Sequence, residues 1–158
     1  GILFAPKSGS ETRRELKNKM DDFVNSLKDI DINEVKEEFL CKVEEIKELY
    51  KYAKEILPAR LQYWSGLTNL HPSGVKITTA KKRFGSCNAR NSLCFSVYLF
   101  SYEKPAIEYV IVHELCHIKQ MNHSARFYAE IDKVFPNYKQ CHLWLKQNGG
   151  MYLNRIPK

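Results

Sequence analysis

The chain has 158 residues, 44% of them hydrophobic, and a formal net charge of +7, so it allows one domain of ordinary size with an appendage. Its five cysteines are odd in number and lack a Cys-x-x-Cys spacing, which argues against disulfides and favours reduced thiols in a cytoplasmic protein. No apolar run approaches the roughly 20 residues that a membrane-spanning helix needs, which argues against a membrane span in this chain.

The first third of the chain predicts helices. Capping-box patterns occur at Ser8-x-x-Glu11 and Asp31-x-x-Glu34. After the second pattern, apolar residues recur every three or four positions, which predicts a long amphipathic helix that Pro58 interrupts. The apolar positions are Val35, Phe39, Val43, Ile46, Tyr50, Ala53 and Leu57.

We expect this helical arm to cover residues 1–49 and a separate domain to cover residues 50–158. Packing on that domain is the default interpretation of the arm, and the alternatives are pairing with another copy or binding a partner. Residues 1–15 resemble the segment that follows the membrane helix in YtxH-like proteins. That resemblance implies a membrane anchor upstream of this segment.

Two strands are expected ahead of the central motif. Val75–Thr79 alternates apolar and polar residues, and Leu93–Phe100 is a longer run of residues that favour strands. Asn88–Ser92 is typical of a turn. Arg83–Cys87 is a candidate edge strand to which an extended peptide substrate could pair, and the alternative is that Gly85 only marks a bulge or turn.

The segment His113-Glu114-Leu115-Cys116-His117, followed by His123, carries most of the chemical information. On a helix, residues four apart share a face, so His113 and His117 can bind one metal ion with Glu114 beside its open position. Pro105 suits the first turn of such a helix. This spacing indicates a zinc-dependent hydrolytic site.

A break after the motif can return His123 to the metal. Asn122-His123-Ser124 reads as that break, with Ser124 as the N-cap of a second helix. The spacing of the three histidines equals that of the metzincin motif, but Gln120 stands where those enzymes have a turn-forming glycine. The turn is therefore made differently here.

The flanks of the motif resemble the YgjP-like metallopeptidase family, a relative of the SprT-like and WLM zinc peptidases. The resemblance covers about residues 50–149. It rests on Lys82-Arg83-Phe84-Gly85-Ser86-Cys87, Tyr109-Val110-Ile111-Val112, Asn122-His123-Ser124 with Phe127, and Trp144-Leu145.

This resemblance implies an α+β, zincin-like minimal metallopeptidase domain, with a small antiparallel sheet packed on the motif helix and a helical arm before it. It implies Zn2+ as cofactor, His113, His117 and His123 as ligands, and Glu114 as the catalytic residue. Phe84 departs from the family, which usually has tryptophan there. The expected substrate is a peptide or protein.

Three neutral imidazoles leave zinc one open position, so bound water loses a proton near pH 7 and Glu114 can act as general base. A donor for the developing oxyanion is also expected, and Tyr138, His142 and Arg126 are candidates. Cys87 is an alternative metal ligand, as a cysteine is in the peptide deformylases.

The distribution of charge along the chain leaves a second interpretation of its function open. Residues 1–57 hold 11 basic and 13 acidic side chains, a net charge of −2. Residues 58–158 hold the other 14 basic and 5 acidic side chains, a net charge of +9, and the two parts sum to +7. This excess makes nucleic acid a candidate partner, although no zinc-finger or helix-turn-helix signature accompanies it. The alternative function is a non-catalytic basic module that binds nucleic acid or protein and keeps a structural or vestigial metal site.

Overall fold

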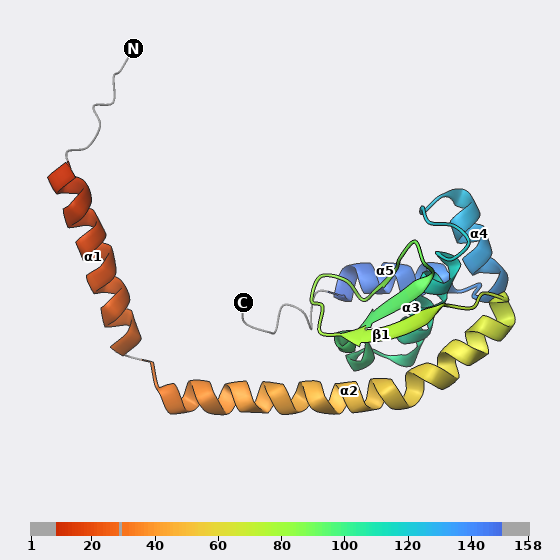
Figure 1. The fold of residues 1–158 in the computed structure, drawn as a ribbon, viewed down its shortest axis with the longest axis horizontal. Helices are drawn as coiled ribbons and strands as arrows, with labels where there is room; N and C mark the ends of the chain where they lie inside the picture. The colour runs from red at the N-terminus through yellow and green to blue at the C-terminus, as the bar shows by residue number, and fades with distance from the viewer. Residues whose placement is uncertain (1–8, 29, 150–158) are drawn as a thin grey trace, which may run out of the picture. The chain divides into compact units, whose positions relative to one another are not determined.

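The computed structural model describes residues 9–28 and 30–149 (Figure 1). The chain divides into two compact units, Gly1–Lys42 and Val43–Lys158. The boundary between them lies inside one long helix, which also runs through residue 49. The predicted division after that residue therefore stays a prediction.

The helices α1 (Gly9–Lys28) and α2 (Ile32–Thr68) form the first part of the described chain. Asp31 caps α2 as predicted, because its carboxylate accepts the backbone N–H of Asn33 at 2.8 Å. The other predicted cap, Ser8, lies outside the described residues.

Pro58 lies inside α2, so the prediction that it interrupts the helix is wrong. Proline removes one backbone hydrogen bond and costs about 3 kcal/mol in a helix interior. Leu57 and Leu61 on either side of it are buried in the core, and this packing holds both halves of the helix in place. Figure 1 shows α2 changing direction in its second half without a break, as a helix with an internal proline does.

A three-stranded sheet lies at the centre of the second unit, with β1 (Gly74–Thr78), β2 (Gly85–Cys87) and β3 (Ser92–Ser96) in the order β1-β3-β2. The small predicted sheet is confirmed, but it is mixed and not wholly antiparallel. The pair β2–β3 is antiparallel because a short turn joins the two strands. The pair β1–β3 is parallel because the chain crosses to the far side of β3 before it returns.

The third strand is shorter than the predicted run Leu93–Phe100. It ends at Ser96, whose hydroxyl accepts the backbone N–H of Tyr98 at 3.3 Å and starts a 3-10 helix, η1 (Val97–Ser101). The apolar residues of this helix are buried. The strand prediction ran too long because a short run of buried apolar residues looks alike in sequence whether it forms a strand or a 3-10 helix.

The core lies between the sheet, the second half of α2 and three further helices, α3 (Lys104–Cys116), α4 (Ala125–Val134) and α5 (Tyr138–Asn148). Leu93 and Phe95 of β3 are fully buried. Helix α3 packs against β2, α4 and α5. This arrangement of a small sheet on a central helix confirms the predicted α+β class.

A buried carboxylate joins α2 to α3. Glu108 of α3 is 6% exposed, and it pairs with the guanidinium of Arg60 and accepts the indole N–H of Trp64. Both partners come from α2. Because a buried charge is costly unless it is paired, these contacts fix the position of α3 on α2.

Candidate metal centre

Helix α3 carries the histidine motif, and Pro105 lies in its first turn as expected. Ile111 and Leu115 are fully buried behind the motif. His113 and His117 are one helical turn apart, and the centroids of their rings are 4.8 Å apart. The buried side of α3 thus orients both rings toward the same point.

The chain after α3 brings back the third histidine. The last turn tightens, with the backbone N–H of Ile118 bonded to the carbonyl of Leu115, three residues back, at 3.0 Å. Gln120 is not among the described residues with a positive φ, so the turn needs no glycine at this position. Ser124 then caps α4 as predicted, since its hydroxyl accepts the N–H of Phe127. This tight turn places His123 beside the end of α3.

The structure brings the three predicted ligands together. His113 Nε2 lies 3.2 Å from His117 Nε2 and 3.0 Å from His123 Nε2. Within residues 9–28 and 30–149, these histidines form the one group of at least three metal-binding side chains whose ligand atoms converge. Cys87 is not in that group, and burial and the nearby Glu114 carboxylate raise the pKa of its thiol.

Hydrogen bonds on the far side of two rings hold these rings in place behind the converging nitrogens. His117 Nδ1 lies 3.0 Å from the carbonyl oxygen of Gln120. Because a carbonyl only accepts, Nδ1 carries the proton and Nε2 keeps a lone pair. His113 Nδ1 lies 3.3 Å from the hydroxyl of Tyr109, which also lies 2.9 Å from His142 Nδ1.

This set of donors fits a divalent metal. Lone pairs that face one another repel unless a cation lies between them, and tetrahedral zinc–imidazole geometry sets its nitrogens about 3.3 Å apart. Burial, followed by the neighbouring His117, His123 and His142, lowers the pKa of His113 to about 3. The ring is therefore neutral at physiological pH, as a metal ligand must be.

Glu114 lies next to the histidines and is 6% exposed. Burial raises the pKa of its carboxyl to about 7, while the positive charge of Arg83 acts in the opposite direction. The carboxylate and all three histidines line one cleft of about 340 Å³, whose opposite wall includes Gly85 of β2. A buried carboxyl with a raised pKa in a cleft is suited to proton transfer.

Gly85 allows β2 to approach this carboxylate. A Cβ atom at Gly85 would lie 2.6 Å from Cγ of Glu114, closer than real side chains come. The sequence alone allowed a bulge, a turn or an edge strand at this glycine. The structure places it in the edge strand β2, where its missing side chain makes room for Glu114.

Two residues near the centre have contacts that the sequence analysis did not predict. Tyr109 lies four residues before His113, and this helical spacing is a signal that could have revealed their contact. His142 comes from α5, so only the fold brings it to Tyr109.

Among the three candidate oxyanion donors, His142 lines a cavity of about 270 Å³ together with His113 and Glu114. Tyr138 instead stacks on Tyr128, with ring centroids 5.8 Å apart. Arg126 is exposed on α4.

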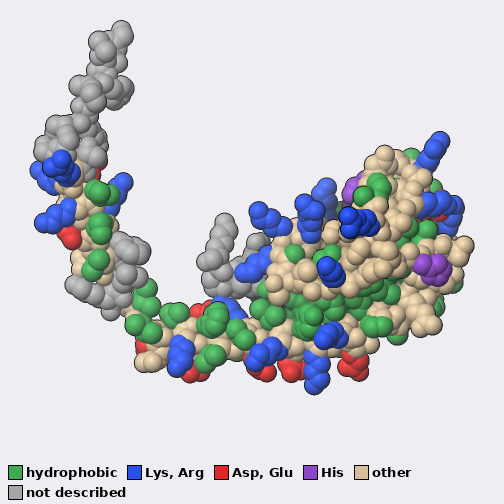
Figure 2. Space-filling model, in the orientation of Figure 1, with side chains coloured by type: hydrophobic (Ala, Val, Ile, Leu, Met, Phe, Trp, Pro, Cys, Tyr) green, Lys and Arg blue, Asp and Glu red, His purple; other side chains and the backbone are tan. Residues whose placement is uncertain are grey.

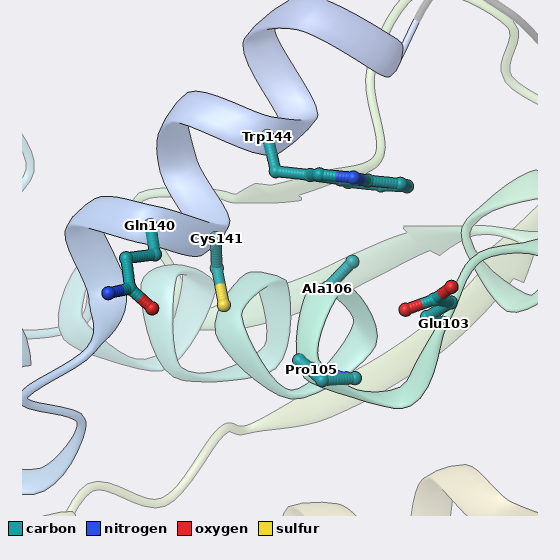
Figure 3. A pocket seen from close by; sticks show the side chains of 6 residues that line it. All are labelled: Glu103, Pro105, Ala106, Gln140, Cys141 and Trp144. Atoms are coloured by element: carbon teal, nitrogen blue, oxygen red, sulfur yellow. The ribbon is translucent and has the colours of Figure 1, made fainter.

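A separate hollow of about 200 Å³ lies between the start of α3 and α5 (Figure 3). The ring of Trp144 extends from α5 over this hollow, and the thiol of Cys141 points toward α3. Glu103, Pro105, Ala106 and Gln140 complete the lining. None of the three histidines lines it, so it is not part of the metal centre.

Two solved structures are similar to this chain, and both are described as metallopeptidase zymogens. Abylysin from Pyrococcus abyssi is 22% identical with a TM-score of 0.50, and the match covers 56% of this chain and 92% of that one. Jannalysin from Methanocaldococcus jannaschii is 23% identical with a TM-score of 0.51, and the match covers 57% of this chain and 93% of that one. At these identities the likeness concerns the fold. No curated protein matches the chain.

Within the described residues, no helix combines the length and apolar character needed to cross a bilayer. The YtxH-like resemblance of residues 1–15 finds no support, and residues 1–8 lie outside the described part of the chain. The resemblance drawn from the flanks of the histidine motif is confirmed, because the YgjP-like metallopeptidase domain matches residues 8–148. The chain therefore belongs to the YgjP-like metallopeptidase family, whose activity is the hydrolysis of peptide bonds with a divalent metal.

Proposed function

We propose that this chain is a zinc-dependent peptidase in which His113, His117 and His123 hold the metal and Glu114 is the general base. The convergence of three imidazole nitrogens beside a buried carboxylate, in one open cleft, carries this proposal. Zinc bound there would supply a Lewis acid that polarises the substrate carbonyl and lowers the pKa of water to about 7.

Glu114 transfers the proton, first as general base and then as general acid. Its carboxylate accepts a proton from the attacking water and then donates it to the amine that leaves. Burial of the Glu114 side chain and the close approach of Gly85 hold the carboxylate in one position. This restraint supports the proposed role, since a general base must stay within hydrogen-bond reach of the proton that it takes.

Tyr109 orients two imidazoles. When His113 binds metal through Nε2, its Nδ1–H donates to the Tyr109 oxygen, and the Tyr109 O–H is left to donate to His142 Nδ1. His142 then carries its proton on Nε2. Because His142 lines the cavity beside Glu114, this N–H is our preferred donor to the developing oxyanion.

The substrate is proposed to bind as an extended strand on the free edge of β2. Strand β2 is an edge of the sheet, and it forms the wall of the cleft opposite the histidines. Backbone pairing of this kind binds a peptide without regard to its sequence. The other edge strand, β1, does not line the cleft that holds the histidines.

The test is the Glu114→Gln variant, assayed with zinc on a fluorescently labelled unfolded protein. Turnover should fall by about 10² to 10⁴ while bound zinc stays unchanged, because a general base is lost and no ligand is. Chelation should abolish turnover of the native chain. The matched control is Glu103→Gln, which removes a carboxylate outside the cleft and should change neither quantity.

Full turnover by Glu114→Gln would overturn the role of Glu114. A zinc-loaded native chain that cleaves no unfolded protein would favour the non-catalytic basic module.

A further inference from the structure

The two faces of the sheet meet different surroundings at β2. Gly85 pairs with Phe95 of β3, and Ser86 pairs with Cys94. Phe95 is buried in the core and Gly85 abuts Glu114, so these two mark the inner face of the sheet. Because side chains alternate along a strand, Ser86 and Cys94 lie on the outer face.

A cavity of about 280 Å³ lies on that outer face. It is lined by Ser86 and Cys94, by Thr78 of β1, and by Lys82 and Arg83 from the segment that leads into β2. Arg83 and Ser86 also line the cleft that contains the histidines. The cavity and the metal cleft therefore adjoin across β2.

The lining of this cavity is suited to an anion. It holds two exposed cations and several hydroxyl groups, and no carboxylate lines it. Neither Lys82 nor Arg83 is engaged in any of the ion pairs found among the described residues. Figure 2 shows Lys and Arg side chains over the visible surface of the second unit, where Asp and Glu are sparse apart from α2.

We propose that this cavity is a substrate subsite that binds the carboxylate of an Asp or Glu side chain through Lys82 and Arg83. The inference rests on the proposed peptidase function and specifies its substrate. A peptide paired to the free edge of β2 directs successive side chains to opposite faces. One side chain would face Glu114 and the metal, and its neighbour in sequence would enter the cavity.

Because the side chains of a paired peptide alternate between the two faces, the preference for an acidic residue should depend on its position in the peptide. An acidic residue should be favoured at one position relative to the cleaved bond and not at the positions directly before and after it. Two peptide pools test this dependence on position. Both pools contain random mixtures of uncharged residues, and they differ only at one fixed position, which is Glu in one pool and Gln in the other. The fixed position is moved along the peptide, and mass spectrometry locates the cut.

The expected preference for Glu over Gln in kcat/KM is about 5-fold at the favoured position, a modest value because both cations are exposed to solvent. It should shrink when sodium chloride is raised from 0.05 to 0.5 M, since salt screens exposed charges. The Lys82→Glu variant should invert the preference, so that Gln pools are cleaved faster. Lys81→Glu is the matched control, because Lys81 does not line the cavity, and it should keep the preference for Glu.

Binding provides a second readout that does not need turnover. Zinc-loaded Glu114→Gln protein is titrated with labelled Glu and Gln peptides, and the Glu peptide should bind more tightly by a similar factor. Equal cleavage and equal binding of the two peptides would overturn the subsite and leave the peptidase intact. Failure to cleave either peptide counts against the proposed function, and the binding titration then decides the subsite by itself.

Discussion

The two walls of the metal cleft differ in burial and in chemistry. On the α3 wall, Glu114 is 6% exposed and His117 is 8% exposed, and hydrogen bonds fix the rings from behind. On the β2 wall, a glycine faces the carboxylate, and the two cations next to it are exposed. The comparison teaches that the proposed reaction chemistry is held on a buried helix, whereas the proposed peptide recognition lies on an accessible strand edge.

The largest expected effect comes from removing a proposed metal ligand on the α3 wall. His117→Ala should lower turnover of an unfolded protein by at least about 10³-fold, because two imidazoles hold zinc poorly. Steady-state assays at fixed zinc concentration measure this loss. The control is His71→Ala, an exposed histidine that does not line the cleft, and comparable turnover by the two variants would contradict the assignment.

A smaller loss is expected from the β2 wall when Gly85 is changed to Ala. The added Cβ would meet Glu114, so the carboxylate must move, and turnover should fall by about 10- to 100-fold while bound zinc stays the same. Gly66→Ala is the matched control because a Cβ there meets nothing within 4 Å. Unchanged turnover of the Gly85 variant would show that the close approach does not position Glu114.

The contact behind His113 should have a more modest effect. Tyr109→Phe removes the hydroxyl that orients this ring, and we expect zinc to bind about 10-fold more weakly, as measured by competition with a chelating dye. Tyr63→Phe, at an exposed position of α2, is the control. Equal zinc affinity of the native chain and the Tyr109 variant would argue against an orienting role.

The smallest effect on chemistry is expected for the contact that holds α3 on α2. Glu108→Gln leaves Arg60 without its partner, and unfolding free energy should fall by about 1–3 kcal/mol, since the guanidinium is still partly solvated. Denaturant titration measures this change. Zinc content of the folded variant should be unchanged, and a loss of zinc without a loss of stability would contradict the structural role.

Local patterns predicted much of the candidate metal centre. His113 and His117 are related by helical spacing, and Ser124 was recognisable as a cap, so the turn that returns His123 could be predicted. The edge strand at Gly85 was one of two interpretations, because a glycine signals close approach without saying to what.

Contacts between distant segments could not be predicted in the same way. His142 meets Tyr109 only because α5 packs on α3, and Glu108 meets Arg60 only because α2 continues past Pro58. In both cases tertiary packing decides the outcome, and it overrides the local preference of proline to end a helix. The parallel pairing of β1 with β3 likewise depends on how the chain crosses the sheet.

X-ray absorption at the zinc edge of the zinc-loaded native chain tests the central claim most directly. The account predicts one zinc per chain, with three imidazole nitrogens at about 2.0–2.1 Å and no sulfur neighbour. A sulfur neighbour at about 2.3 Å would contradict the assignment of the three histidines, because it would place a cysteine such as Cys87 on the metal. A chain that remains free of zinc after loading would contradict the account as a whole.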